Sequence, residues 1–112
     1  MKKKFRIKKN IEFQNIIDTG NSFANREFVI YYKEKSNQFN FRVGISVGKK
    51  IGNAVTRNKI KRYIREVFRE LENEIIENID IIIIARNPTK GMNLQQFKKS
   101  ILHLLHKQRL LK

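Results

Sequence analysis

Residues 39–47 alternate large apolar side chains with polar or small ones, and this is the clearest strand signal in the chain. The apolar positions are Phe39, Phe41, Val43, Ile45 and Val47, and the positions between them are Asn40, Arg42, Gly44 and Ser46. A period of two sends successive side chains to opposite faces of a strand. We therefore expect a sheet in which this strand has one face in a core and one face open.

Two further segments are predicted to form strands. Residues 22–33 include the β-branched and aromatic run Phe28-Val-Ile-Tyr-Tyr, a composition typical of strands. Residues 79–85 show no alternation from Ile81 to Ile84, so we expect this strand to be buried on both faces. Asn87-Pro88 follows and should end the strand.

Three segments are predicted to form helices. The first begins at Asn10, a suitable N-cap, and ends at Gly20. The second is capped by Asn53 or Thr56, and its apolar stripe comprises Ile60, Ile64, Val67, Phe68 and Leu71. The third begins after Asn93, where Gln96 three residues later resembles a capping box.

The order is therefore helix, about three strands, helix, strand, helix, which indicates an α/β (α+β) fold. The simplest arrangement places the helices on one face of a small mixed sheet and leaves the other face partly open. The 112 residues suffice for a single domain spanning 1–112. Cysteine is absent, which excludes disulfides and thiol chemistry, and no apolar run is long enough to span a membrane. We expect a soluble cytoplasmic protein.

Charge is the first indication of function. The chain has 25 Lys and Arg against 10 Asp and Glu, a formal net charge of +15. A small domain with this excess repels itself unless a polyanion neutralises it. Nucleic acid is the favoured partner, and an anionic membrane surface is the second choice.

The second predicted helix carries a cluster of positive charge. At about 100° per residue, its basic side chains and Asn58 fall on a sector beside the apolar stripe. Guanidinium groups suit phosphate because they donate two parallel hydrogen bonds, and an amide can bond phosphate, sugar or a base edge. The members of this basic ridge are Arg57, Asn58, Lys61, Arg62, Arg65 and Arg69.

Residues 48–66 closely resemble the signature of the bacterial ribonuclease P protein component. The core of that signature is matched by Arg57-Asn58, Lys61-Arg62 and Arg65-Glu66 at the same spacing. The flanks agree as well, at the basic leader, Phe13, Asn25-Arg26-Glu27-Phe28, Arg42-Val-Gly-Ile-Ser and Ile82-Ile-Ile-Ala-Arg. The resemblance spans nearly the whole chain.

This resemblance implies an RNA-binding subunit of an endoribonuclease that removes the 5′ leader from precursor tRNA. The catalytic RNA subunit would perform the hydrolysis with Mg²⁺, and the protein would bind that RNA and the single-stranded leader. The implied fold is a two-layer sandwich like that of certain ribosomal proteins, with a left-handed strand–helix–strand crossover. Neither a membrane nor DNA is an expected partner.

The resemblance also implies roles for particular residues. The RNA-binding set is Lys50, Arg57, Asn58, Lys61, Arg62 and Arg65. The leader cleft, between the first helix and the sheet, comprises Phe13, Ile17, Tyr31 and Ser46, with Lys50 beside it. Phe13 and Tyr31 offer faces for stacking unpaired bases, whereas Ile17 offers apolar contact only.

We assign no catalytic or metal-binding residue to the chain. His103 and His106 are expected on the solvent side of the last helix, and Glu70, Glu72, Glu74 and Glu77 resemble a solvated helix end. A structural ribosomal-type RNA-binding protein would share the charge and fold. A DNA-binding helix module is a third reading, but the chain lacks a second helix spaced as in a helix-turn-helix.

Overall fold

Four strands form one mixed sheet in the order β1-β2-β4-β3. The computed structural model describes residues 1–112. Its strands are β1 (Asn21–Ala24), β2 (Phe28–Glu34), β3 (Arg42–Ser46) and β4 (Ile79–Ala85), and its helices are α1 (Asn10–Thr19), α2 (Ala54–Glu70) and α3 (Leu94–Lys107). Short 3₁₀ turns are η1 (Lys3–Phe5), η2 (Lys49–Ile51) and η3 (Asn87–Thr89). This element order confirms the predicted α/β fold.

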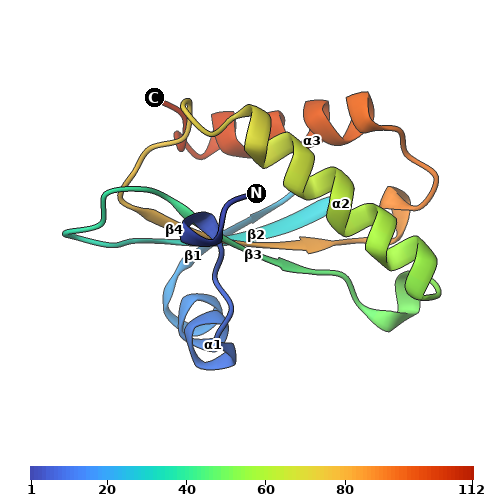
Figure 1. The fold of residues 1–112 in the computed structure, drawn as a ribbon, viewed down its shortest axis with the longest axis horizontal. Helices are drawn as coiled ribbons and strands as arrows, with labels where there is room; N and C mark the ends of the chain where they lie inside the picture. Colours follow the sequence, from blue (N-terminus) through green and yellow to red (C-terminus); the bar gives the residue numbers. More distant parts are fainter.

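The sheet contains a left-handed crossover. β1–β2 and β2–β4 pair antiparallel, whereas β3 and β4 are adjacent and parallel, joined through α2. In Figure 1 both strands run to the right, β3 lies in front of β4, and α2 crosses above them, which is the left-handed arrangement. About 98% of such crossovers are right-handed, so the residues alone favour the opposite hand and only the family resemblance anticipates this one.

The main core lies between the sheet and the two long helices. One face of the sheet packs against α2 and α3, which lie together above it in Figure 1. The fully buried members of this layer include Phe28, Ile30, Ile81, Ile83, Ile64, Phe68, Phe97 and Ile101. The sheet and these two helices form the expected two-layer sandwich.

The first helix covers the other face of the sheet, so the expectation of all helices on one face is wrong for α1. Ile16 of α1 packs against Ile82 of β4 and Ile7 of the leader in a second, smaller cluster. Figure 1 shows α1 below the sheet, opposite α2 and α3. The reason is β4 itself, because a strand with isoleucines on both faces needs cover on both. The prediction that β4 is buried on both faces is confirmed.

Phe39 and Asn10 depart from their predicted places. The strand predicted over 39–47 spans only Arg42–Ser46, and Phe39 lies before it with its side chain exposed. Asn10 is the first residue of α1 and Lys9 takes the N-cap position. Asn53 caps α2 by accepting from the Thr56 N–H, which decides between the two predicted caps, and the Asn93–Gln96 capping box begins α3 as predicted.

The aromatic ring of Phe13 on α1 packs directly against Gly44 of β3. A Cβ at this position would lie 2.4 Å from Cζ of Phe13 and 2.7 Å from Cδ1 of Ile82. Gly44→Ala should therefore lower the free energy of unfolding by about 1–3 kcal/mol, because the overpacked ring has to move. Urea denaturation measures the loss, and the cost should shrink in a Phe13→Ala background. An equal cost in both backgrounds would show that Phe13 does not rest on Gly44.

Candidate nucleic-acid interface

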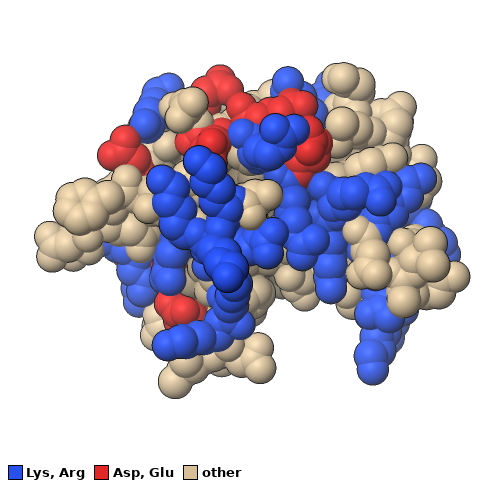
Figure 2. Space-filling view, viewed as in Figure 1, with Lys and Arg blue, Asp and Glu red and all other residues tan.

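The basic ridge lies along the solvent side of α2, as the wheel of the sequence predicts. Ile60, Ile64, Val67 and Phe68 turn the opposite side of the helix into the core. Asn58 and Arg62 are exposed, whereas Arg57, Lys61 and Arg65 are half-buried and lie in a row at every fourth position. In Figure 2 the Lys and Arg side chains form a broad band across the face of the molecule that includes α2, and most of the acidic side chains in view gather above this band.

The positive charge of the ridge is not neutralised within the protein. Of the acids on α2, Glu66 pairs with Arg69, at the end of the ridge, and Glu70 pairs with Lys98 of α3. No carboxylate lies within 4 Å of the cationic groups of Lys50, Arg57, Lys61, Arg62 or Arg65. These five cations are therefore free to bind an external anion, and Arg69, which the wheel also places on the ridge, is not.

Lys50 lies on the loop that leads into α2. Lys50 belongs to η2 and is exposed, and it does not line the cleft between α1 and β3. Arg57 supports this loop, because its Nε donates a hydrogen bond of 3.1 Å to the carbonyl oxygen of Gly52. Arg57 thus fixes the loop that carries Lys50 and also presents the remaining N–H groups of its guanidinium to solvent.

A cleft of ≈ 470 Å³ opens between α1 and the edge strand β3. Phe13 of α1 and Ser46 of β3 line it from opposite sides. Ile17 and Tyr31 do not line this hollow but pack beside Phe13 against the small cluster beneath α1. Tyr31 is half-buried and lies opposite Ile82 in the strand register, one row from the Ser46–Ile84 pair. The four predicted cleft residues therefore share one face of the sheet, in two adjoining groups.

The ridge and the cleft meet at Arg65. β3 is the outermost strand of the sheet, so a long side chain from α2 can pass its edge, and Arg65 lines the same cleft as Phe13 and Ser46. The positively charged surface of one sheet face is thereby continuous with the hollow on the other. Neither the helical wheel of α2 nor the alternating pattern of β3 predicts that Arg65 lies beside Phe13 and Ser46.

The leader segment contributes cleft residues that the sequence reasoning missed. Arg6, Lys8 and Asn10 line the hollow, and the N–H of Ile7 donates to the carbonyl of Val43 at 2.9 Å, so the leader extends along the edge of β3. The Nε of Arg6 is buried without a hydrogen-bond partner in the protein. The only available signal was the run of basic residues before Asn10, which indicates charge but not this pairing.

A charged triad fixes α1 over the sheet. Arg42 donates to both carboxylate oxygens of Asp80, at 3.0 and 2.7 Å, and to Glu12 of α1 at 2.9 Å. Asp80 is fully buried within β4, and its hydrogen bonds with Arg42 raise the pKa of that guanidinium above its ordinary value. Because β3, β4 and α1 each supply one member, the triad links α1 to two strands of the sheet on the side where the cleft opens.

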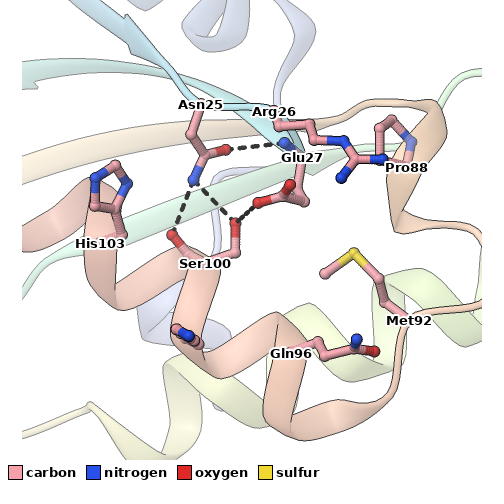
Figure 3. A pocket seen from close by; sticks show the side chains of 9 residues that line it. Asn25, Arg26, Glu27, Pro88, Met92, Gln96, Ser100 and His103 are labelled. Atoms are coloured by element: carbon pink, nitrogen blue, oxygen red, sulfur yellow. Dashed lines mark hydrogen bonds between the residues drawn. The ribbon is translucent and has the colours of Figure 1, made fainter.

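The motif residues Asn25 and Glu27 form a second polar cluster with Ser100 of α3, and this cluster is structural. The amide of Asn25 donates to the carbonyl and the hydroxyl of Ser100 and accepts from the N–H groups of Glu27 and Phe28. The Ser100 hydroxyl in turn donates to Glu27 at 2.8 Å, as Figure 3 shows. A hollow of ≈ 640 Å³ lies beside this cluster, but its Asn25 amide has no free hydrogen-bonding capacity. The cluster joins the β1–β2 turn to α3.

Other titratable residues form no further site. His103 and His106 are exposed on α3, as expected, and no group of three or more His, Cys, Asp or Glu side chains could hold a metal ion. No helix of the chain has the length and apolar character needed to cross a bilayer.

A helix of unpaired cations beside a half-open aromatic cleft defines a small nucleic-acid-binding protein. Comparison with known proteins makes this specific, because a family model described as Ribonuclease P matches residues 1–109. The chain belongs to the ribonuclease P protein family, and it is a subunit of the tRNA-processing ribonuclease P.

Individual relatives agree over the full length. The ribonuclease P protein component of Oceanobacillus iheyensis is 61% identical over 112 residues, which is 100% of this chain and 93% of that protein. That of Listeria monocytogenes serotype 4a is 54% identical, over 100% of this chain and 94% of that protein. The solved RNase P protein of Staphylococcus aureus superposes with a TM-score of 0.89 at 48% identity, covering 96% of this chain and 98% of that one. The solved RNase P protein of Thermotoga maritima superposes with a TM-score of 0.83 at 30% identity, covering 91% of this chain and 96% of that one.

The Asn25 cluster generates a stability prediction. Asn25→Ala should lower the free energy of unfolding by about 1–3 kcal/mol, because it leaves Ser100 and two backbone N–H groups without their partner. The neighbouring Arg26 is exposed, so Arg26→Ala serves as the matched control and should stay within about 0.5 kcal/mol. Urea denaturation followed by circular dichroism measures both. An unchanged midpoint for Asn25→Ala would contradict the assignment.

Proposed function

We propose that this subunit binds the catalytic RNA of ribonuclease P with the basic ridge and holds the 5′ leader of precursor tRNA in the cleft. The observation that carries the proposal is the position of Arg65, which joins the unpaired cations of α2 to the cleft lined by Phe13 and Ser46. One RNA on the ridge and a second strand in the cleft would then lie side by side. The proposed RNA-binding residues remain Lys50, Arg57, Asn58, Lys61, Arg62 and Arg65.

The ridge suits a phosphate backbone more than base edges. Except for Arg69, which pairs with Glu66, the cations of the ridge lie at helical spacing with no carboxylate within 4 Å, so each can replace a counterion of the RNA. Arginine contributes paired N–H donors to a phosphate, whereas lysine acts as a point charge. The resulting binding is sensitive to shape and salt and largely independent of sequence.

The cleft suits a single strand. Phe13 lines the cleft and Tyr31 packs beside it against the same small cluster. Both are half-buried, so each ring is held by the protein on one side and can stack a base on the other. Such stacking contributes roughly 1–3 kcal/mol per base and tolerates any sequence, as a variable leader requires. Ile17 adds apolar contact, and the hydroxyl of Ser46 and the cations of Arg6 and Arg65 lie where a phosphate would pass.

Hydrolysis is proposed to belong to the RNA subunit with its Mg²⁺ ions. The polar side chains that line the cleft are those of Arg6, Lys8, Asn10, Ser46 and Arg65, so the cleft brings cations, an amide and a hydroxyl to the RNA and no carboxylate or imidazole. We expect these groups to bind and orient the leader. The protein would favour the complex between precursor tRNA and the RNA subunit in two ways. Its cations would neutralise RNA phosphates, and its cleft would hold the leader beside the RNA subunit.

Reconstitution distinguishes this role from that of a structural ribosomal-type protein. The chain is added to a bacterial ribonuclease P RNA at a Mg²⁺ concentration too low for cleavage by RNA alone. Recovery of 5′-leader removal from precursor tRNA supports the proposal. Binding to the RNA without recovered cleavage would favour the ribosomal-type alternative.

Arg62→Ala tests the ridge. Loss of one phosphate contact should weaken binding to ribonuclease P RNA and make the plot of log affinity against log salt less steep by about one unit. Filter binding from low to moderate salt measures the slope. Lys107, which is also an exposed cation but lies on α3, provides the matched control, and Lys107→Ala should leave the slope unchanged. Equal slopes for Arg62→Ala and the unaltered protein would remove Arg62 from the interface.

Tyr31→Ala tests the cleft. The reconstituted enzyme should lose its preference for precursor over mature tRNA, because only the precursor carries the strand that stacks on this ring. Tyr31→Phe keeps the ring and should retain the preference, which separates stacking from the hydroxyl. Binding to the RNA subunit alone should be unaffected. Equal losses on precursor and mature tRNA would argue against a leader cleft.

A further inference from the structure

The loop between β2 and β3 holds an aromatic ring in solvent. Phe39 is 89% exposed, more than any other large apolar side chain of the chain. The next aromatic residue in the alternating pattern is not free in this way, since Phe41 is buried against Phe5 and Phe68. In Figure 1 this loop projects beyond the end of the sheet, at the far left.

Both neighbours of Phe39 are fastened to the body of the protein. The side-chain amide of Gln38 donates to the carbonyl of Ile79 at 3.1 Å and to Asp80 at 3.0 Å. The amide of Asn40 donates to the carbonyl of Lys4 at 2.9 Å. Asn37 turns the chain with a φ of 64°, a conformation that asparagine tolerates better than most residues. The ring is therefore presented on a fixed loop rather than carried on a loose one.

Lysine residues lie on the two segments that adjoin the Phe39 loop. Asn40 joins the loop to the leader, whose Lys2, Lys3 and Lys4 are all exposed, and Lys35 begins the loop. No carboxylate lies within 4 Å of any of these four ammonium groups. An exposed ring whose adjoining segments carry lysines without acidic partners combines the two features that bind an unpaired base together with its phosphates. A protein partner would instead need a wider apolar patch than one ring.

We propose that Phe39 is a stacking anchor for an unpaired or helix-end base of the catalytic RNA subunit, with Lys2–Lys4 and Lys35 on the adjoining phosphates. The inference rests on the proposed RNA-binding function and adds a second contact region to it. The loop and the start of α2 lie at opposite ends of the long axis of the molecule, which measures 38 Å. An RNA that meets both must be large and folded, which favours the RNA subunit over the leader strand in the cleft.

A tryptophan reporter tests the contact directly, because the chain contains no tryptophan. In Phe39→Trp, emission of the single indole should be quenched when ribonuclease P RNA is added and a base stacks on it. Ile11→Trp is the matched control, since Ile11 is 77% exposed on α1, and its emission should change little. Precursor tRNA added alone should leave the indole of Phe39→Trp unquenched. Quenching by precursor tRNA alone, or by neither RNA, would overturn the assignment to the RNA subunit.

Affinity supplies the second readout. Phe39→Ala should weaken binding to ribonuclease P RNA by about fivefold to a hundredfold, whereas Phe39→Tyr should bind normally and the denaturation midpoint of both should be unchanged. If Arg62→Ala weakens binding and Phe39→Ala does not, the stacking anchor is refuted while the proposed function stands. If the unaltered protein fails to bind the RNA, the proposed function itself fails. A shift in the indole emission of Phe39→Trp with protein concentration, in the absence of RNA, would identify a second copy of the chain as the occupant and overturn the inference.

Discussion

The double-sided burial of β4 is the constraint on which the rest of the structure depends. Ile81 and Ile83 face the layer of α2 and α3, and Ile82 faces α1, so helices are required on both sides of one short sheet. With only three helices available, α1 alone covers the second face, and it covers part of it. The part left open beside the edge strand β3 is the cleft. The cleft is therefore a consequence of covering the second face of the sheet with a single helix.

The parallel pairing of β3 with β4 then brings the charge to this hollow. Because β3 is the edge strand, α2 connects it to β4 across the other face, and a long side chain such as Arg65 reaches past the edge. Four acidic side chains near these elements pair with basic residues other than the free cations of the ridge. Glu66 and Glu70 pair with Arg69 and Lys98, and Asp80 and Glu12 pair with Arg42 under α1. The remaining cations of the ridge face outward without partners.

Local patterns in the sequence account for most of the fold. The capping box at Asn93, the cap at Asn53 and the unbroken isoleucine run were sufficient for α3, α2 and β4, since each depends on neighbours within a few residues. The alternating pattern wrongly predicted that the strand includes Phe39. The alternation extends into the loop, where hydrogen bonds of Gln38 and Asn40 to distant segments hold the chain out of the sheet. The side of the sheet taken by α1 was missed for a similar reason, since it is decided by packing against Ile82 and not by α1 itself.

The candidate site divides in the same way. The ridge could be drawn on a helical wheel, because its residues share one helix. Phe13, Ile17, Tyr31 and Ser46 came from a family resemblance, and no periodicity could have joined residues from α1, β2 and β3. Arg6 and Lys8 were missed because their place depends on a single backbone hydrogen bond between Ile7 and Val43. Tertiary pairings of this kind leave no mark in a local pattern.

The central claim is that two different RNAs meet on the two sides of Arg65, and cross-linking from defined positions tests it most directly. The chain lacks cysteine, so Ser46→Cys and Asn58→Cys each accept one photoreactive group in the reconstituted enzyme bound to precursor tRNA. We expect the group at position 46 to label the 5′ leader and the group at position 58 to label the RNA subunit. Labelling of the same RNA from both positions, or of the leader from position 58 alone, would contradict it.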